Sequence, residues 1–279
     1  MPRKSTTSRA RKGSSRRKRG FRMPRPWPGP ALRKKLWRNF RGMPGAMQVI
    51  VGLAVLGIFW LGSNWIYQVV RKPSELFFPV SGTLYKSPRE TWQQYEPIFR
   101  KHSTATISPE FLAALAQVEG SGNPIVRTYW RWSWSHKPYE VYRPASSAVG
   151  MYQITDGTFA EARRLCIHDH RVVEDDAKGQ KCWFNSLYMR VIPSHAVEMT
   201  SAYLDHRVAM VLRRNRIRRA TVAQKQDLAA VIHLCGAGAG NRYGARGLRL
   251  TPGQRCGDHD VRAYIAKVNS TKRAFAGLR

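Results

Sequence analysis

The sequence predicts a mostly α-helical protein in which a basic tail, one membrane-spanning helix and a helical domain follow one another. Three observations lead to this fold class. The chain carries no charge between Arg41 and Arg71, and this run is strongly apolar. Downstream of it, apolar residues recur every three or four positions in several segments, without the long alternating pattern typical of strands. Sixteen of the 48 Lys and Arg residues, but none of the 17 Asp and Glu residues, lie in residues 1–41.

Residues 1–41 are predicted to form a disordered basic tail. They are rich in Ser, Pro and Arg and contain too few apolar residues to bury a core. The net charge of +31 for the whole chain suits anionic partners. Nucleic acid is one such partner, but few aromatic residues lie among the cations of the tail, and no recognition fold surrounds it. We therefore expect the tail to orient the membrane segment and to contact anionic lipids.

Residues 42–70 are predicted to cross a membrane as a helix. An uncharged run of this length is rare in a soluble core, and Trp60, Trp65 and Tyr67 near its end are typical of a membrane–water interface. A cleaved signal peptide is disfavoured because the run is long and no A-x-A-like site follows it. Sixteen cationic residues precede the run and only four occur in residues 71–90, so the amino terminus is expected in the cytoplasm and the rest outside it.

Residues 71–87 are predicted to be a linker, and residues 88–279 the exported domain. The segment "SPRE" at 87–90 is typical of a capping box with proline at the first helical position, and "SPEF" at 108–111 opens a second helix in a similar way. Further helices are predicted at 155–166, 193–214, 221–235 and 258–275.

The cysteines all lie in the exported part of the chain. An even number of cysteines in an oxidising compartment predicts two disulfides, and sequential pairing would give Cys166–Cys182 and Cys235–Cys256. The alternative is a zinc site formed by Cys166, His168, His170 and Cys182, but their spacing fits no standard finger. We expect no metal and no cofactor.

One acidic residue, Glu119, stands out within the helix that begins at 109. It lies four residues after Leu115 and seven after Leu112, so it projects from the apolar face. A carboxyl group held against apolar neighbours is favoured in its protonated form, which is the form that a general acid requires. The alternative is a glutamate at a helix end that turns into solvent.

Residues 146–159, "SSAVGMYQITDGTF", carry further features of a site. With Glu119, the residues Ser147, Gly150, Gln153 and Thr158 resemble the lytic transglycosylases of the soluble-lytic-transglycosylase type, which are related to goose-type lysozymes. "AAVIHLCGAGAGNRYG" (229–244) is similar to the A-A-Y-N-A-G-x-G segment of that family, and "DVRAYIAKV" (260–268) to its E-T-R-x-Y-V-x-K-V ending. The resemblance covers about residues 108 to 275 and implies a lysozyme-like helical fold.

The resemblance implies cleavage of the MurNAc–GlcNAc β-1,4 bond of peptidoglycan, with Glu119 as the catalytic acid and base and a 1,6-anhydromuramoyl product. It also implies a bacterial inner-membrane protein with a periplasmic domain that binds glycan strands. The substrate contacts that it implies are Ser147, Gly150, Met151, Tyr152, Gln153, His233 and Tyr264.

This chain differs from the family pattern at Gly120, where serine is usual, and at Leu234, where asparagine is usual. Two alternatives follow. One is a lysozyme-type hydrolase, although no second carboxylate is compelling. The other is a wall-binding or scaffold module without activity, which Leu234 favours and the presence of Glu119 and Gln153 opposes.

An aromatic and basic segment at 125–144 separates Glu119 from the glycine-containing motif. Alternation would place Trp130, Trp132 and Trp134 on one side of an extended strand. These rings could stack on sugars, and the neighbouring cations suit carboxylates. They could equally pack on the domain or on the membrane surface.

Overall fold

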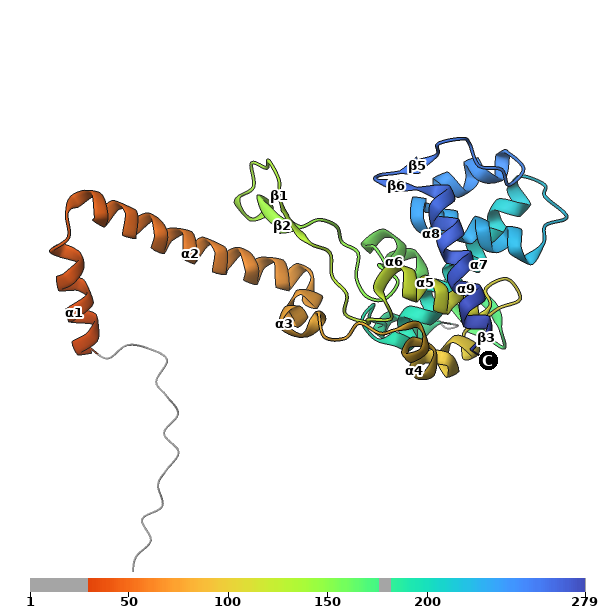
Figure 1. Ribbon diagram of the computed structural model, residues 1–279, viewed down its shortest axis with the longest axis horizontal. Coiled ribbons are helices and arrows are strands. Elements are labelled where there is room, and N and C mark those ends of the chain that lie inside the picture. The colour runs from red at the N-terminus through yellow and green to blue at the C-terminus, as the bar shows by residue number, and fades with distance from the viewer. Residues whose placement is uncertain (1–29, 176–181, 279) are drawn as a thin grey trace, which may run out of the picture. The chain divides into compact units, whose positions relative to one another are not determined.

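The computed structural model describes residues 30–175 and 182–278 and divides the chain into two compact units, one up to Trp60 and one from Leu61 onward. The long helix α2 (Gly45–Arg71) runs through the boundary between them (Figure 1). Each unit is described by itself.

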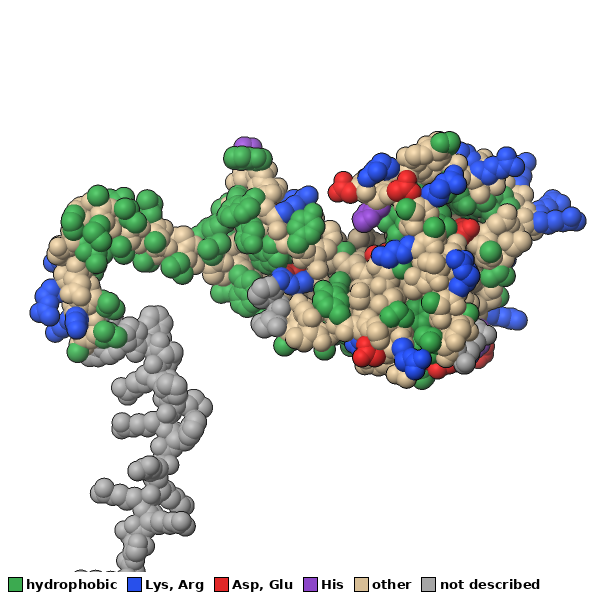
Figure 2. Space-filling model, in the orientation of Figure 1, with side chains coloured by type: hydrophobic (Ala, Val, Ile, Leu, Met, Phe, Trp, Pro, Cys, Tyr) green, Lys and Arg blue, Asp and Glu red, His purple; other side chains and the backbone are tan. Residues whose placement is uncertain are grey.

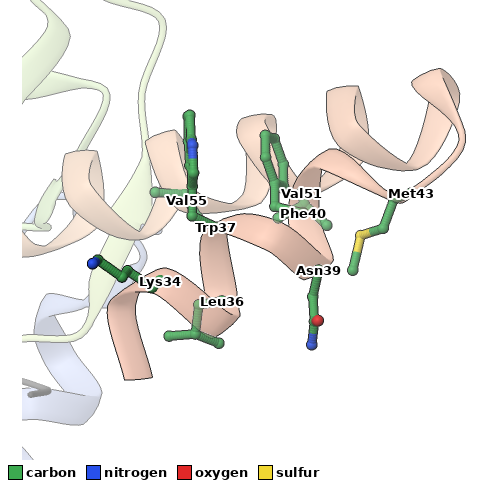
Figure 3. Close-up of a pocket in the computed structure, with 8 residues that line it drawn as sticks. All are labelled: Lys34, Leu36, Trp37, Asn39, Phe40, Met43, Val51 and Val55. Atoms are coloured by element: carbon green, nitrogen blue, oxygen red, sulfur yellow. The ribbon is translucent and has the colours of Figure 1, made fainter. Parts of the chain in front are cut away.

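The first unit contains helix α1 (Pro30–Arg41) and the beginning of α2. Leu32, Leu36, Trp37 and Phe40 recur on one face of α1, so this segment has an apolar stripe in spite of its basic composition. The prediction of a disordered tail is therefore wrong for α1, and its remaining part, residues 1–29, lies outside the described residues. Figure 3 shows side chains of α1, of α2 and of the turn between them around a groove, which is lined by Lys34, Leu36, Trp37, Asn39, Phe40, Met43, Val51 and Val55.

Helix α2 is long and apolar enough to span a membrane. Its 27 residues correspond to about 40 Å, whereas the hydrocarbon core of a bilayer is about 30 Å thick. Large apolar side chains such as Ile50, Leu56 and Phe59 are exposed along it, as lipid contact would require.

The second unit is mainly helical, and capping residues explain where its helices start. The capping box of Ser87 and Glu90 predicted from the sequence opens α4 (Pro88–Lys101), and Ser108 caps α5 (Pro109–Gly120). The other helices are α3 (Phe78–Ser81), α6 (Asp156–Ala162), α7 (Pro193–Arg214), α8 (Val222–Ala245) and α9 (Val261–Ala276). Short 3-10 turns lie at Pro73–Phe77, Pro138–Glu140 and Trp183–Leu187.

Three short antiparallel hairpins interrupt the helices, namely β1–β2 (Trp130–Trp132, Tyr142–Pro144), β3–β4 (Leu165–His168, Arg171–Glu174) and β5–β6 (Arg255–Cys256, His259–Asp260). The helix predicted at 155–166 therefore ends early, because the chain turns into β3. The helix predicted at 221–235 ends at a kink, where Gly236 has a φ of 78° inside α8.

Helix α5 lies at the centre of the core. Its residues from Glu110 to Ala116 are all buried, and α4 and α9 pack against it. A helix that is apolar on all sides is typical of a core position. The carboxyl-terminal end of α5, which carries Glu119, is thereby fixed by packing from several sides.

Both predicted disulfides are confirmed. Cys166 pairs with Cys182 at a Cα–Cα distance of 5.6 Å, and Cys235 pairs with Cys256 at 5.5 Å. The first bond joins β3 to the turn at 183–187. The second joins the kink of α8 to β5, in the hairpin that precedes α9. Since Cys166 and Cys182 bond to each other, they are not zinc ligands.

Candidate functional site

The end of α5 is pressed against the loop at 146–154. A Cβ atom at Gly120 would lie 2.9 Å from the Cα atom of Met151, closer than such atoms approach, so only glycine fits there. The serine usual at this position in the resembled family would collide with the Met151 backbone. The helix then ends at Ser121, which has a left-handed conformation with a φ of 48°.

Three helices bring polar groups together at Glu119. The Tyr264 hydroxyl of α9 donates a hydrogen bond to Glu119 Oε1 at 2.5 Å, and His233 Nε2 of α8 lies 3.8 Å from the same oxygen. The Glu119 side chain keeps 18% of its surface exposed, so it is shielded but reachable. Glu119, His233 and Tyr264, which the sequence analysis named as catalytic or substrate-binding residues, therefore lie in one cluster.

Both partners of Glu119 are held in their neutral forms. Burial lowers the pKa of His233, and the attraction of Glu119 and a hydrogen bond with the Tyr152 backbone only partly oppose this. Burial, and then the charge of Glu119, raise the pKa of Tyr264 well above its usual value. Glu119 therefore accepts a hydrogen bond from the Tyr264 hydroxyl, and burial disfavours a positive charge on His233 beside it.

The loop at 146–154 is built around a glycine. Gly150 has a φ of 79°, and a Cβ atom there would lie 2.4 Å from the Arg190 carbonyl oxygen. Gln153 also has a positive φ, and its Nε2 donates to the Gly150 carbonyl at 2.8 Å. Ser147 Oγ accepts a hydrogen bond from the Asp156 amide at 3.2 Å. Ser147, Gly150 and Gln153 thus shape the loop itself.

Met151 and Tyr152 are fully buried in the core, and the Tyr152 hydroxyl donates to the Leu112 carbonyl at 3.2 Å. The predicted contact of these two side chains with substrate does not fit this placement. Because the loop closes over α5, the Met151 and Tyr152 side chains are buried more deeply than the sequence motif suggested. The two side chains pack in the core beneath the loop and so hold the loop in place.

A cavity of about 160 Å³ lies beside the Glu119 cluster, between the motif at 146–159 and the motif at 229–244. Helix α7 contributes residues that the sequence analysis missed, since nothing in the pattern of α7 distinguishes them from core positions. One of them, Thr200, has a buried Oγ1 without a hydrogen-bond partner among the described residues. The lining consists of Gln153, Ile154, Thr155, Thr158, Ala162, Met199, Thr200, Tyr203, Ile232, His233, Leu234 and Gly236.

The loop also depends on Arg190, another residue that the sequence analysis missed. Its guanidinium donates to the carbonyl oxygens of Ser147 and Ile154 at 2.9 and 2.8 Å and pairs with Asp156 at 2.8 Å. It lies in an irregular segment 40 residues from the motif that it supports, where no local pattern could mark it.

The aromatic hairpin is attached elsewhere, at the end of α2. Trp130 and Trp132 both pack on Tyr142, and their ring centroids lie 5.2 and 4.7 Å from the Tyr142 centroid. The two tryptophan rings therefore lie on one side of the strand, as alternation predicted. Trp130 Nε1 donates to Glu75 at 2.8 Å. Trp134 is fully exposed.

The comparisons with known proteins add no relative. No protein-family model matches the chain, and no curated protein matches it. Any assignment of function therefore depends on the motifs and on the geometry around Glu119.

Proposed function

We propose that this protein is a membrane-anchored peptidoglycan lytic transglycosylase with a lysozyme-like helical domain. The observation that carries the proposal is the Glu119 cluster. A glutamate at the end of a buried helix has two neutral partners, Tyr264 and His233, and lies beside a cavity. A shielded carboxyl that has a neutral donor, and no Lys or Arg in an ion pair with it among the described residues, suits a group that must both give and take a proton.

In the proposed reaction, Glu119 protonates the glycosidic oxygen between MurNAc and GlcNAc. The ionised Glu119 then takes the proton from the muramoyl C6 hydroxyl as that oxygen attacks C1, which closes the 1,6-anhydro ring. The Tyr264 hydroxyl stabilises the ionised carboxylate between the two steps by donating to Oε1.

A single carboxylate is enough for this reaction because the substrate supplies its own nucleophile. Among the described residues, the hydrogen bond and the ion pair of Glu119 involve Tyr264 and His233 and no second carboxylate. Glycosidases that use water or a covalent intermediate have a second carboxylate across the bond. The surroundings of Glu119 therefore favour a transglycosylase over a lysozyme-type hydrolase.

The proposed location is the bacterial inner membrane, with the amino terminus in the cytoplasm and the catalytic domain in the periplasm. The asymmetry of Lys and Arg about α2 supports this orientation, and two disulfides on one side of the span agree with an oxidising compartment. The basic tail would contact anionic lipids in the cytoplasmic leaflet.

A non-catalytic wall-binding module is the second candidate. Leu234 favours it, because this residue lines the cavity where the resembled family has asparagine and offers no polar group to a substrate. The two candidates differ in whether glycan strands are cut.

The test is to incubate the full chain, in detergent, with purified peptidoglycan sacculi and to weigh the released products by mass spectrometry. A transglycosylase releases anhydro products, which are one water lighter than the reducing products of a hydrolase. Glu119→Gln should abolish release, whereas the matched variant Glu140→Gln, which changes a hairpin glutamate paired with Arg71 and Lys137, should not. Reducing products would identify a hydrolase. Binding without release by the unaltered chain would identify the non-catalytic module.

A further inference from the structure

The last turns of α2 are bound to the β1–β2 hairpin by direct contacts. Asn64 Nδ2 donates to the Tyr142 carbonyl at 2.8 Å, and Gln68 Nε2 donates to the Tyr139 carbonyl at 2.6 Å. The Tyr67 and Tyr139 rings stack with centroids 5.1 Å apart. Because α2 exceeds the hydrocarbon thickness by roughly 10 Å, these turns and the hairpin belong to the headgroup region of a bilayer that α2 spans.

A buried ionic cluster fixes the base of the same hairpin. Glu75, fully buried, contacts Lys72 Nζ at 3.3 Å, Arg127 Nη1 at 3.1 Å and Trp130 Nε1 at 2.8 Å. Lys72 Nζ also donates to the Ser146 carbonyl at 3.3 Å. The helix exit, the following turn and both ends of the hairpin are therefore held as one body.

A cavity of about 280 Å³ opens between the helix exit and the end of β2. Three cations line it, Arg71 and Lys72 from the helix exit and Arg143 from β2. The Arg143 Nε is buried and has no hydrogen-bond partner among the described residues. Three cations that line one cavity suit an anionic oxygen, to which guanidinium and ammonium groups donate charge-assisted hydrogen bonds. The rest of the lining is Gln68, Pro144, Ala145, Ser146, Ser147 and Asp156.

The carboxylates near this cavity are already engaged. Asp156 pairs with Arg190 at 2.8 Å, and Glu140 lies 3.7 Å from Arg71 and 3.5 Å from Lys137. Burial lowers the pKa of Lys72, an effect that Glu75 opposes. Arg71 is more than half exposed, and its pairing with Glu140 is long, so the positive charge of Arg71 stays available to a ligand.

The outer surface of the hairpin suits the same environment. Tyr129, Trp132 and Trp134 are exposed, and Figure 2 shows hydrophobic side chains gathered over this hairpin and over α2. Trp and Tyr concentrate where a membrane meets water, because their rings are apolar and their N–H and O–H groups are polar. A phosphate-bearing lipid headgroup would be present at the depth of the cavity.

We propose that the cavity formed by Gln68, Arg71, Arg143 and Ser146 binds the phosphate of an anionic phospholipid in the leaflet where α2 emerges. The hairpin tryptophans lie in the same interface. The domain is then held at the membrane surface by three contacts, namely α2, the aromatic hairpin and one bound headgroup. This site is separate from the basic tail and does not depend on catalysis.

The test uses the full chain in phosphatidylcholine nanodiscs that contain a minor fraction of phosphatidylglycerol with a photoactivatable headgroup. After illumination, mass spectrometry identifies the labelled peptides. We expect labelling within residues 65–75 and 139–147, and at least about fivefold less of it in the double variant Arg71→Gln, Arg143→Gln. The matched variant Arg213→Gln, Arg214→Gln changes two exposed cations of α7 and should label like the unaltered chain. Labelling of residues 1–41 is the internal reference, which neither variant should change.

Two further arms separate lipid from other sources. Phosphatidylcholine with the same photoactivatable group should label the cavity peptides several-fold less, and excess inorganic phosphate should leave the phosphatidylglycerol labelling unchanged. Equal labelling by the two lipids, or equal labelling in both double variants, would overturn the proposal. Loss of labelling with inorganic phosphate would assign the cavity to free phosphate instead. The comparison of lipids on the unaltered chain remains decisive even if the Arg71, Arg143 variant fails to fold.

Discussion

Glu75 and Glu119 are both largely withdrawn from water, but they have opposite kinds of partners. Glu75 is surrounded by Lys72, Arg127 and the Trp130 indole N–H, so its charge is neutralised and its position fixed. Glu119 has a phenol and an imidazole whose pKa values are shifted toward their neutral forms. The difference teaches that cationic partners tie a buried glutamate into the structure through its charge, whereas uncharged donors orient the carboxyl group without an ion pair.

The largest expected effect is on turnover. Glu119→Gln should reduce release of anhydro products by at least about 10²–10⁴-fold, because both proposed half-steps use the same carboxyl group. The free energy of unfolding should stay equal or increase, since an amide is easier to bury than a charge. Product release and urea unfolding of the same sample in detergent measure the two quantities. Full turnover by a folded Glu119→Gln variant would remove Glu119 from the mechanism.

Glu75→Gln should do the reverse. Removing the carboxylate leaves the buried Lys72 without its ion-pair partner, and such a change typically costs about 3–5 kcal/mol. Turnover per folded molecule should stay near that of the unaltered chain, because the described contacts of Glu75 are with Lys72, Arg127 and Trp130 and not with Glu119. Urea unfolding and activity normalised to folded protein check this. A stable Glu75→Gln variant that had lost activity would show that Glu75 serves turnover and not stability.

Loss of either disulfide should lower stability, but only one of the two losses should also lower turnover. Each closes a loop of similar length, so replacing either pair with serines should lower the free energy of unfolding by about 3 kcal/mol. Cys235–Cys256 joins the segment after His233 to the segment before Tyr264, and its loss should also reduce turnover. Loss of Cys166–Cys182 should affect stability alone. Equal turnover in the two folded double variants would count against the positioning role of the second disulfide.

Tyr264→Phe tests the neutral donor. It keeps the ring and removes the hydrogen bond to Glu119 Oε1, and a bond to a charged acceptor contributes about 1.5–3 kcal/mol. We expect turnover to fall by about tenfold or more while sacculus binding changes little. Tyr243→Phe changes another largely buried tyrosine, on α8, and is the matched control. An unchanged rate in folded Tyr264→Phe would show that Glu119 acts without this donor.

The smallest effect concerns acid stability. The pKa of His233 is lowered in the folded state, so below its unfolded value of about 6.5 the unfolded chain binds more protons. Stability should therefore fall as the pH drops from about 6.5 toward the lowered pKa of His233, and be independent of this group above that range. His233→Gln should show a shallower loss between neutral and mildly acidic pH. His102, whose pKa burial also lowers, continues to contribute in both proteins.

Several features of this protein were determined by the sequence itself. The caps at Ser87 and Ser108, the apolar run of α2 and the sequential cysteine pairs are local patterns, because they depend on residues a few positions apart or on composition. The position of Glu119 on an apolar helical stripe belongs to the same class. The amphipathic face of α1 was present in the sequence too, but its many cations concealed it.

Only the tertiary structure decided which groups surround the two glutamates. Tyr264 reaches Glu119 across 145 residues, and Trp130 reaches Glu75 across 55. The tertiary structure likewise placed Met151 and Tyr152 in the core and attached the aromatic hairpin to the end of α2. The physical reason is the distance along the chain over which each interaction acts. Helical hydrogen bonds and caps join near neighbours in the chain, whereas burial and charge depend on the packing of distant segments, which no local pattern records.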